Sequence, residues 1–334
     1  MIRERTPVST KPDRLSDIDR LKGFAIALVV WGHIASFAPM GSPSAFYISI
    51  AVIYSFHMPV FMYLSGFVFF HAGLHERFWN APYKQIANRF DRLMIPFLFF
   101  GVLVLLGKYV VGQFVALPDP VESLSVGFVS ILRDTPDNPS ASIWYLLVIF
   151  VYAIATPLLW RLGRARFLLL FAVGIAGWII PLPADFYASR VGKYFLFFAI
   201  GGFVATRGSG ILAIIQRYAL VFVGIFVLLC VFFFAHPLAL LICGLSAIPA
   251  LHGVFRQHSL QGDRLFATLG RNSMAIYLMN TIFIGLAGIA LLMLGVRSWA
   301  LFALLFLAGM IGPLIVKAVF DRVGPLKPLA RYLA

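Results

Sequence analysis

The chain alternates between long apolar runs and short polar stretches that are rich in Lys and Arg. Ten of the apolar runs reach or approach the roughly 20 residues that an α-helix needs to cross the hydrocarbon core of a bilayer. They cover residues 19–37, 46–71, 93–115, 142–160, 167–183, 190–206, 218–235, 238–254, 273–295 and 299–318. Only His236-Pro237 separates the seventh run from the eighth, and a proline there favours a tight turn between two helices. The pattern predicts an all-α, polytopic membrane protein with about ten transmembrane helices.

The composition supports a membrane protein and argues against a soluble one. Of the 334 residues, 61% are hydrophobic and 12% are charged, whereas soluble domains carry about 25% charged residues. The net charge of +14 is of a size that can indicate nucleic-acid binding. The basic residues, however, lie at the ends of the apolar runs, where they anchor helices in a membrane. We therefore expect membrane lipid as a partner and no nucleic acid.

The distribution of Lys and Arg predicts the orientation of the spans. If the N-terminus lies inside, 22 of the 27 basic residues fall on the cytoplasmic side. The five exceptions are Lys108, which lies within a span, and four residues on the outer side, Arg133, Arg190, Lys193 and Arg297. Because cytoplasmic segments are enriched in Lys and Arg, both termini are predicted to be cytoplasmic. The expected organisation is an N-terminal tail (1–16), a membrane core (17–322) and a C-terminal tail (323–334).

The first apolar run contains two polar residues that are candidates for chemistry. Lys22 and His33 are eleven positions apart, which is about three helical turns and a rise of about 16 Å, so both lie on one helix face. A histidine in hydrocarbon needs a partner or a task, and an imidazole can act as a general base near neutral pH. Lys22, near the inner interface, can neutralise an anionic ligand that arrives from the cytoplasm. The alternative is an interfacial anchor together with a structural histidine.

A second histidine lies in the middle of the next apolar run. His57 closely precedes Pro59, which removes a backbone hydrogen bond and kinks the helix. A kink beside a buried imidazole opens space and frees carbonyl oxygens, and the nearby Ser65-Gly66 permits close helix packing. Two histidines at similar depth on adjacent helices are more informative than one. A polar contact between helices, without chemistry, is the alternative.

Three further stretches carry candidate binding residues. Arg89 and Arg92 are i and i+3 on one helix face, and paired guanidinium groups suit phosphate recognition. Topological anchoring is the alternative for either arginine alone. Trp144-Tyr145 opens the fourth span at the outer interface, where an aromatic belt is the alternative. Asn280 is a polar side chain within the ninth span, and we expect it to have a partner on another helix.

Taken together, these stretches resemble acyltransferase family 3, the integral-membrane O-acyltransferases that include bacterial polysaccharide and fucose O-acetyltransferases. The resemblance runs from about residue 14 to 322 and rests on the order and spacing of several motifs. These are Ile18-Asp19-Arg20-Leu21-Lys22-Gly23 with Gly32-His33, His57-Met58-Pro59-Val60-Phe61 with Ser65-Gly66, Arg89-x-x-Arg92 with Ile95-Pro96, Ile143-Trp144-Tyr145-Leu146, and Gly270-x-x-Ser273-x-x-Ile276-Tyr277-Leu278. Many members have His at the position that Asn280 occupies in this chain.

The resemblance implies transfer of an acyl group from cytosolic acyl-CoA, most commonly acetyl-CoA in this family, to a carbohydrate hydroxyl. The acceptor would be a polysaccharide or a lipid-linked saccharide, the location the bacterial inner membrane, and no metal is expected. The residues expected in catalysis are His33 as the general base, His57 and Asp19. Those expected to bind acyl-CoA are Lys22, Arg89 and Arg92, and those expected to contact the acceptor are Trp144, Tyr145 and Asn280.

Other function classes stay open at this point. A transporter or flippase for a lipid-linked sugar would also use membrane histidines and kinked helices, but it would not bind acyl-CoA. A sensor or scaffold would not need an aligned polar face. O-succinyl transfer within the same family is a further alternative, and the acceptor sugar and the oligomeric state stay open.

Overall fold

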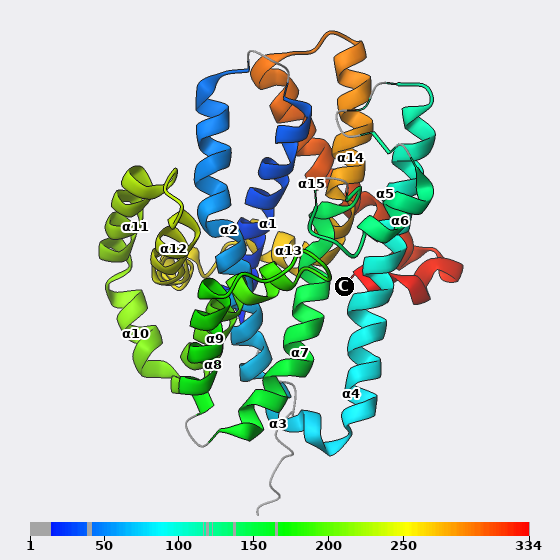
Figure 1. The fold of residues 1–334 in the computed structure, drawn as a ribbon. Coiled ribbons are helices and arrows are strands. Elements are labelled where there is room, and N and C mark those ends of the chain that lie inside the picture. The colour runs from blue at the N-terminus through cyan, green and yellow to red at the C-terminus, as the bar shows by residue number, and fades with distance from the viewer. Residues whose placement is uncertain are drawn as a thin grey trace, which may run out of the picture.

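The structure, a computed structural model, describes residues 15–38, 42–115, 117, 120–121, 123–135, 138–163 and 166–333. Within these ranges it consists of helices joined by short connections, and extended backbone pairs only in one isolated bridge between Arg133 and Asp185. The predicted all-α class is therefore confirmed. Figure 1 shows a bundle in which α1 (Ser16–His33) is enclosed by the other helices.

The long helices coincide with the predicted apolar runs. Among the described residues, seven helical units are long and apolar enough to cross a membrane. They are α1 with η1 (Ile34–Phe37), α2 (Ser44–His71), α4 (Pro82–Arg89) with η3 (Phe90–Met94) and α5 (Ile95–Gly112), η4 (Ala141–Ile143) with α7 (Trp144–Leu162), α9 (Ala188–Arg207), α14 (Ser273–Met293) and α15 (Ser298–Arg322). The chain is thus a multi-pass integral membrane protein.

The remaining apolar runs are helical but form less regular spans. The pair α10 (Ser209–Arg217) and α11 (Ala219–Phe233) is bent by 70° and adds an eighth candidate span. The helix α8 (Arg166–Ile179) has 14 residues and α12 (Ala239–Phe255) has 17, so both are short for a full crossing. The described part of the chain therefore has seven or eight candidate spans, and the count of ten with cytoplasmic termini stays a prediction.

Short helices complete the described chain. They are α3 (Leu74–Arg77), η2 (Phe78–Asn80), α6 (Leu124–Ser130), η5 (His258–Leu260), α13 (Leu265–Arg271) and η6 (Gly324–Leu333). The last of these covers most of the predicted C-terminal tail. It packs back against α14 and α15, with Ala330 and Leu333 buried, so this segment belongs to the folded body.

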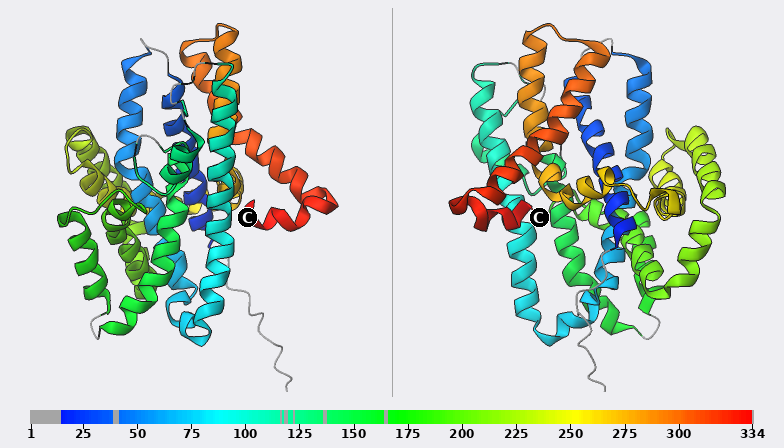
Figure 2. Two further views of the ribbon diagram at one scale, coloured as in Figure 1. Left: turned by 45° about the vertical axis from the view of Figure 1, so that its right-hand side comes forward. Right: turned by 180° about the vertical axis from the view of Figure 1, so that it is seen from behind.

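Helix α1 is central because it is apolar around most of its circumference, as expected of an interior helix. It packs against α2, α12, α13, α14 and α15, and Figure 2 shows it enclosed from two further directions. Asp17 and Arg20, in its first turns, have polar partners, as buried charged groups need. Arg256 Nη1 donates to Asp17 Oδ2 at 2.5 Å, and Arg20 Nη2 donates to the carbonyl oxygen of Phe255 at 2.9 Å.

The contact between α2 and α9 depends on a glycine. A Cβ atom on Gly66 would overlap the backbone carbonyl of Phe198, so any larger residue would push the two helices apart. Small residues at helix contacts let backbones approach closely in membranes. The predicted role of Ser65-Gly66 in close helix packing is therefore confirmed.

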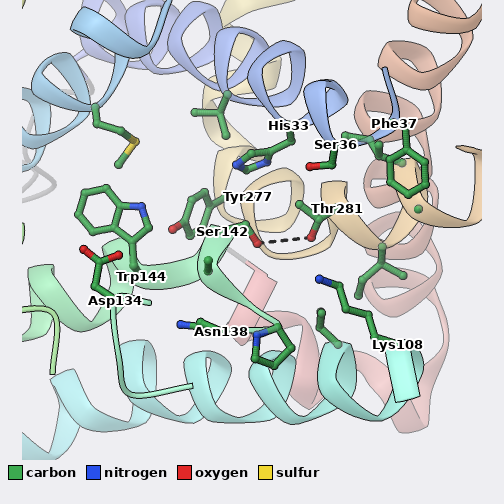
Figure 3. Close-up of a pocket in the computed structure, with 18 of the residues that line it drawn as sticks. His33, Ser36, Phe37, Lys108, Asp134, Asn138, Ser142, Trp144, Tyr277 and Thr281 are labelled. Carbon is green, nitrogen blue, oxygen red and sulfur yellow. Dashed lines mark hydrogen bonds between the residues drawn. The ribbon is translucent and has the colours of Figure 1, made fainter. Parts of the chain in front are cut away.

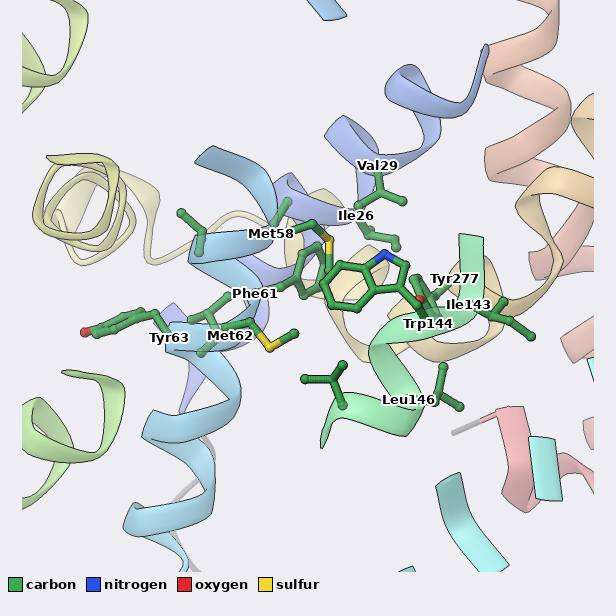
Figure 4. Packing of buried hydrophobic residues seen from close by; sticks show 14 of the residues in the cluster. Ile26, Val29, Met58, Phe61, Met62, Tyr63, Ile143, Trp144, Leu146 and Tyr277 are labelled. Atoms are coloured by element: carbon green, nitrogen blue, oxygen red, sulfur yellow. The ribbon is translucent and has the colours of Figure 1, made fainter. Parts of the chain in front are cut away.

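A packed apolar layer connects α1, α2, α7 and α14, as Figure 4 shows. Its members include Ile26, Val29, Met58, Phe61, Met62, Ile143, Trp144, Leu146 and Tyr277. Val29 lies one turn before His33, and Met58 directly follows His57. This layer therefore fixes the helix segments that carry the two histidines.

Candidate active site

A cavity of about 790 Å³ lies between α1, α2, α5, α7, α9 and α14. Both predicted histidines line it: His33 comes from the end of α1, and His57 comes from the middle of α2. Figure 3 shows the imidazole of His33 directed into this space. The volume is in the range of sites for small organic ligands.

His33 is held by Asn280 of α14. The Nδ1 atom of His33 lies 2.6 Å from Oδ1 of Asn280. The Nδ2 group of Asn280 donates to the carbonyl oxygens of Ile276 and Tyr277, both at 2.8 Å. Both hydrogens of the Asn280 amide nitrogen are donated to these carbonyls. The amide oxygen therefore faces the His33 ring, and because an amide oxygen can only accept, Nδ1 of His33 carries the hydrogen. The lone pair of a neutral His33 is consequently on Nε2.

His57 has the same tautomer for a different reason. Its Nδ1 atom lies 2.7 Å from the carbonyl oxygen of Ile53, one turn earlier in α2. A carbonyl can only accept, so Nδ1 donates and the lone pair of the neutral ring is again on Nε2. The side chain is only 7% exposed, and its ring packs against Tyr54 with centroids 5.2 Å apart.

A close contact between α1 and α2 brings the two histidines together. The hydroxyl of Tyr54 donates to the carbonyl oxygen of Gly32 at 2.9 Å, in the residue directly before His33. A Cβ atom on Gly32 would lie 2.5 Å from a ring carbon of Tyr54, so only glycine permits this approach. The two imidazoles are near enough for a charge on one to act on the other. The predicted juxtaposition of His33 and His57 is therefore confirmed.

Hydroxyl groups and an indole ring from η4, α7 and α14 form another wall. Ser142 Oγ and Thr281 Oγ1 lie 3.5 Å apart beside His33, and the hydroxyl of Tyr277 accepts a hydrogen bond from the backbone N–H of Tyr145 at 3.2 Å. Trp144 also lines the cavity. The cavity thus offers hydroxyl donors and an aromatic face close to the imidazoles.

Two of the predicted acceptor-binding residues lie outside this wall. Tyr145 is not among the cavity-lining residues, and its hydroxyl hydrogen-bonds to Ser65. Asn280 is fully buried behind His33, at 0% exposure, and does not line the cavity. Asn280 does have the predicted partner on another helix, which is His33 itself. Of the three residues, only Trp144 can touch a molecule in the cavity.

Three basic side chains also line the cavity: Lys108, Arg190 and Lys193. Figure 3 shows the amino group of Lys108 directed from α5 toward Ser142 and Thr281. Arg190 forms an ion pair with Asp134, with Nη2 2.6 Å from Oδ1, and its guanidinium lies 4.5 Å from the ring centroid of Trp144. These cations were not predicted as site residues. In the sequence they stand out only because they are among the five basic residues that do not fall on the predicted cytoplasmic side.

The segment before α7 forms part of the cavity wall through Asp134 and Asn138. It is tied to the connection before α9, because Asn138 Nδ2 donates to the Tyr187 hydroxyl and that hydroxyl donates to the carbonyl oxygen of Ile131 at 3.1 Å. Burial raises the pKa of Tyr187 to about 12, so it stays a neutral hydrogen-bonding group. The wall is therefore built from fixed residues.

The predicted acyl-CoA residues form a separate cationic group at the other end of α1. Arg92 is close enough for its charge to act on both Lys22 and Arg89, and Asp19 acts on Lys22 in the same way. Arg92 lies within η3, a π-helical turn, which is a feature frequent at functional sites. None of these four residues lines the cavity. The structure thus brings the cations together but places them apart from the histidines.

The C-terminal segment packs beside this group. Asp91, between the two arginines, accepts hydrogen bonds from Arg331 Nη2 at 3.2 Å and from the Tyr332 hydroxyl at 2.9 Å. Among the described residues, no three His, Cys, Asp or Glu side chains come together as metal ligands would.

These features define a class: a helical, multi-pass membrane protein with two imidazoles in an internal cavity and a cationic group at the far end of the same helix. Comparison with known proteins identifies the family, because the acyltransferase domain matches residues 15–318. The chain therefore belongs to acyltransferase family 3, a family of membrane acyltransferases, and the resemblance noted in the sequence is confirmed.

Two curated relatives are similar over part of the chain. Nodulation protein NolL of Mesorhizobium japonicum is 27% identical over 220 residues, which cover 65% of this chain and 54% of that protein. Nodulation protein NolL of Sinorhizobium fredii is 35% identical over 88 residues, or 26% of this chain and 23% of that protein. The chain thus spans about half the length of the first of these relatives. No solved structure gives a significant match.

Proposed function

We propose that the protein transfers an acyl group, in the first place acetyl, from cytosolic acyl-CoA to a hydroxyl of a cell-surface or exported carbohydrate at the bacterial inner membrane. The observation that carries this proposal is His33 in the wall of a cavity, held from behind by Asn280. A histidine oriented by a third group is the arrangement that activates a hydroxyl nucleophile in acyl transfer. Family membership independently supports the same reaction.

In the proposed reaction, Nε2 of His33 takes the proton of the acceptor hydroxyl as its oxygen attacks the thioester carbonyl. The new C–O bond forms, the carbonyl oxygen becomes an oxyanion, and the C–S bond then breaks. The thiolate of CoA leaves and takes the proton from the imidazolium. Asn280 supports this cycle because its oxygen accepts from Nδ1 throughout and keeps the lone pair on Nε2.

The hydrogen bonds around His57 and Tyr277 separate their proposed roles. Neutral His57 has an acceptor at Nε2, so it can orient the acceptor hydroxyl but cannot donate to an oxyanion. The Tyr277 hydroxyl accepts from the backbone N–H of Tyr145, so its own proton is available. We assign oxyanion stabilisation to Tyr277, helped by the hydroxyls of Ser142 and Thr281.

Acyl-CoA is proposed to bind with its phosphates at Lys22, Arg89 and Arg92. Guanidinium and ammonium groups in one place suit a polyphosphate. Lys22 and His33 lie on one face of α1, about 16 Å apart along its axis, so an extended pantetheine arm would follow that face toward the cavity. Asp19 is proposed to orient Lys22. Trp144 is proposed to contact the acceptor, with Tyr145 and Asn280 acting from behind the wall.

The experiment compares the glycans of a strain that lacks the gene with those of complemented strains, by mass spectrometry. We expect wild-type protein and the control variant His236→Ala to restore acylation, because His236 is an exposed residue outside the cavity. His33→Ala should leave glycans unacylated at normal protein levels. Full acylation by His33→Ala would refute the role of His33 as base.

Purified protein distinguishes the enzyme from a transporter of lipid-linked sugar. The enzyme binds acyl-CoA in lipid nanodiscs, and a transporter does not. The mass added to the glycan separates an acetyl from a succinyl group. Protein that binds no acyl-CoA, with glycans that are mislocalised rather than unacylated, would support transport instead.

A further inference from the structure

The cavity that holds the histidines has an apolar side, which is formed by α5 and α14. Its members are three or four residues apart on each helix, so those of one helix share one face. They include Leu103, Gly107 and Val111 of α5 and Ile282, Leu286 and Ile289 of α14. Figure 3 shows Phe37 at this side of the cavity, across from Trp144 and Asp134. Lys108 of α5 directs its amino group toward Ser142 and Thr281.

Two glycines at this side leave open space between the helices. A Cβ atom built on Gly107 would have no heavy atom of a described residue within 4 Å. Among the described residues, a Cβ atom on Gly285 would meet only the Cζ atom of Phe37, at 3.8 Å. Both glycines line the cavity. Close contact with a neighbouring helix, which explains Gly66, therefore does not account for glycine at these two positions.

The same side of the cavity reaches the outer surface of the helix bundle. Leu103 is 43% exposed and Leu286 is 58% exposed, although both line the cavity. On α5, Leu103 and Gly107 are surface neighbours of Leu106 and Val110, which are exposed and do not line the cavity. Both helices are long and apolar enough to cross a membrane, so this continuous surface joins the cavity to the lipid around the protein.

The opening, here termed the slit, suits a hydrocarbon chain. It is bounded by Leu103, Gly107, Gly285 and Leu286. A saccharide would lose hydrogen bonds to water among these residues, which costs free energy, whereas a hydrocarbon chain has none to lose. From Leu103 to Val111 the apolar face extends about 12 Å along α5. On α14, Ile282 directly follows Thr281, which lies beside His33, so the apolar face begins at the reaction centre.

We propose that the acceptor is a lipid-linked saccharide that enters from the bilayer through the slit, with its hydrocarbon chain between α5 and α14 and its sugar at His33. This inference rests on the proposed acyl transfer and specifies its acceptor class and route. A long acyl chain of the donor would also be apolar. It would arrive with CoA along α1, however, and a closed pocket would be enough to hold it. An opening to lipid is needed by a molecule whose chain stays in the membrane.

The first experiment identifies the form of the acceptor. Wild-type protein in nanodiscs is incubated with radiolabelled acetyl-CoA and with either the lipid extract or the aqueous glycans of the strain that lacks the gene. We expect label in the lipid extract, and mild acid should release it as a labelled saccharide. Label only in the aqueous glycans, or in a lipid that yields no saccharide, overturns the inference and leaves acyl transfer standing. If neither fraction is labelled, the proposed function fails and the inference falls with it.

The second experiment narrows the slit. Gly107→Leu and Gly285→Leu each place a side chain in the open space. We expect kcat/KM for the lipid-linked saccharide to fall about 10-fold or more, as at other overpacked sites. For the same saccharide released from its lipid, kcat/KM should not change. Gly224→Leu is the matched control, because Gly224 of α11 also has open surroundings among the described residues and does not line the cavity.

The Kd of acetyl-CoA checks that each variant is folded, because the proposed donor region lies at the other end of α1. An equal loss of kcat/KM with both forms of the saccharide would show that the leucines obstruct the cavity itself, and it would overturn the inference. Unchanged kinetics in Gly107→Leu and Gly285→Leu would do the same. A loss seen only when a long-chain acyl-CoA replaces acetyl-CoA would assign the slit to the acyl chain of the donor instead.

Discussion

Two cationic regions of the protein differ in position and in surroundings. Lys22, Arg89 and Arg92 gather near the start of α1, close enough for Arg92 to act on both neighbours. Lys108, Arg190 and Lys193 line the cavity at the other end of that helix, beside His33 and His57. The first region follows the cytoplasmic distribution of basic residues, and the second violates it.

Basic residues in the two regions are informative about function for different reasons. A cytoplasmic arginine at a helix end is expected in any membrane protein, so Arg89 and Arg92 became informative only through their spacing and the family motif. A lysine in an apolar run is costly, so Lys108 was informative by position alone. We interpret the two regions as separate sites, for the acyl donor and for the acceptor, joined by one face of α1.

The largest effect on substrate binding is expected from removing the donor region. Arg89→Gln with Arg92→Gln should raise KM for acyl-CoA by on the order of 10²-fold or more, because each charge-assisted contact contributes about 1.5–3 kcal/mol. KM for the glycan should not change. Arg77→Gln, an exposed arginine of α3, is the control, and steady-state kinetics in nanodiscs give both constants. A rise in KM for the glycan alone would reverse the assignment of the two regions.

A smaller effect, on kcat, is expected from removing Asn280, which holds the general base His33. Asn280→Ala removes the acceptor of the Nδ1 hydrogen, so His33 can rotate and change tautomer. We expect kcat to fall by about 10- to 100-fold, as when other groups that orient a histidine are removed, with both KM values unchanged. Asn280→Asp keeps an oxygen at that place and should retain more activity. Equal kcat for Asn280→Ala and wild type would show that Asn280 does not position His33.

The contact between α1 and α2 offers a milder perturbation of the same region. Gly32→Ala places a methyl group against the Tyr54 ring, and such overpacking costs about 1–3 kcal/mol. We expect kcat to fall about 10-fold while acyl-CoA binding is kept. Because the obstacle is one side chain, Gly32→Ala combined with Tyr54→Ala should be more active than Gly32→Ala alone. A double variant that loses as much as the two single changes added together would rule out this contact as the cause.

The smallest effect lies outside both regions and serves as a control for pH experiments on them. His75 of α3 packs between Phe70 and Trp160, and burial lowers its pKa below the ordinary value. Well above pH 6.5, the ordinary pKa of histidine, the ring is neutral in both the folded and unfolded states. As the pH falls below that value, the unfolded state takes up the proton first, so the free energy of unfolding decreases.

Thermal unfolding at pH 7.5 and pH 5.5 measures this contribution. The midpoint of wild type should fall by a few degrees at most more than that of His75→Gln. An identical pH dependence in the two proteins would show that His75 does not contribute. In that case, a change of acyl-transfer activity with pH could be attributed to residues of the cavity without subtracting an effect of His75 on stability.

Local patterns in the sequence predicted the helices and the two histidines, because apolar runs and isolated imidazoles are visible without knowledge of the partner helices. Neighbouring residues on a helix point about 100° apart, which explains why Trp144 faces the cavity and Tyr145 faces Ser65. The bond between His33 and Asn280 joins residues 247 positions apart. Asn280 could be predicted to have a partner on another helix, but only the packing of α1 against α14 identifies it.

The sequence also could not predict that the cations of the cavity lie together. Each was visible in the sequence as an exception, but α5 and α9 must pack around one space before Lys108 and Lys193 share a wall. In the same way, the 70° bend between α10 and α11 and the short lengths of α8 and α12 appear only in the structure. Apolar length alone predicted ordinary spans at 167–183, 218–235 and 238–254.

The most direct test of the account separates binding from transfer in a single variant. Purified His33→Ala in nanodiscs is compared with wild type for the Kd of acetyl-CoA and for the rate of acyl transfer to glycan in a single turnover. The account predicts an unchanged Kd, because the donor region is intact, and a transfer rate lower by about 10²- to 10⁴-fold, the contribution of a general base. Transfer by His33→Ala at the wild-type rate would contradict it.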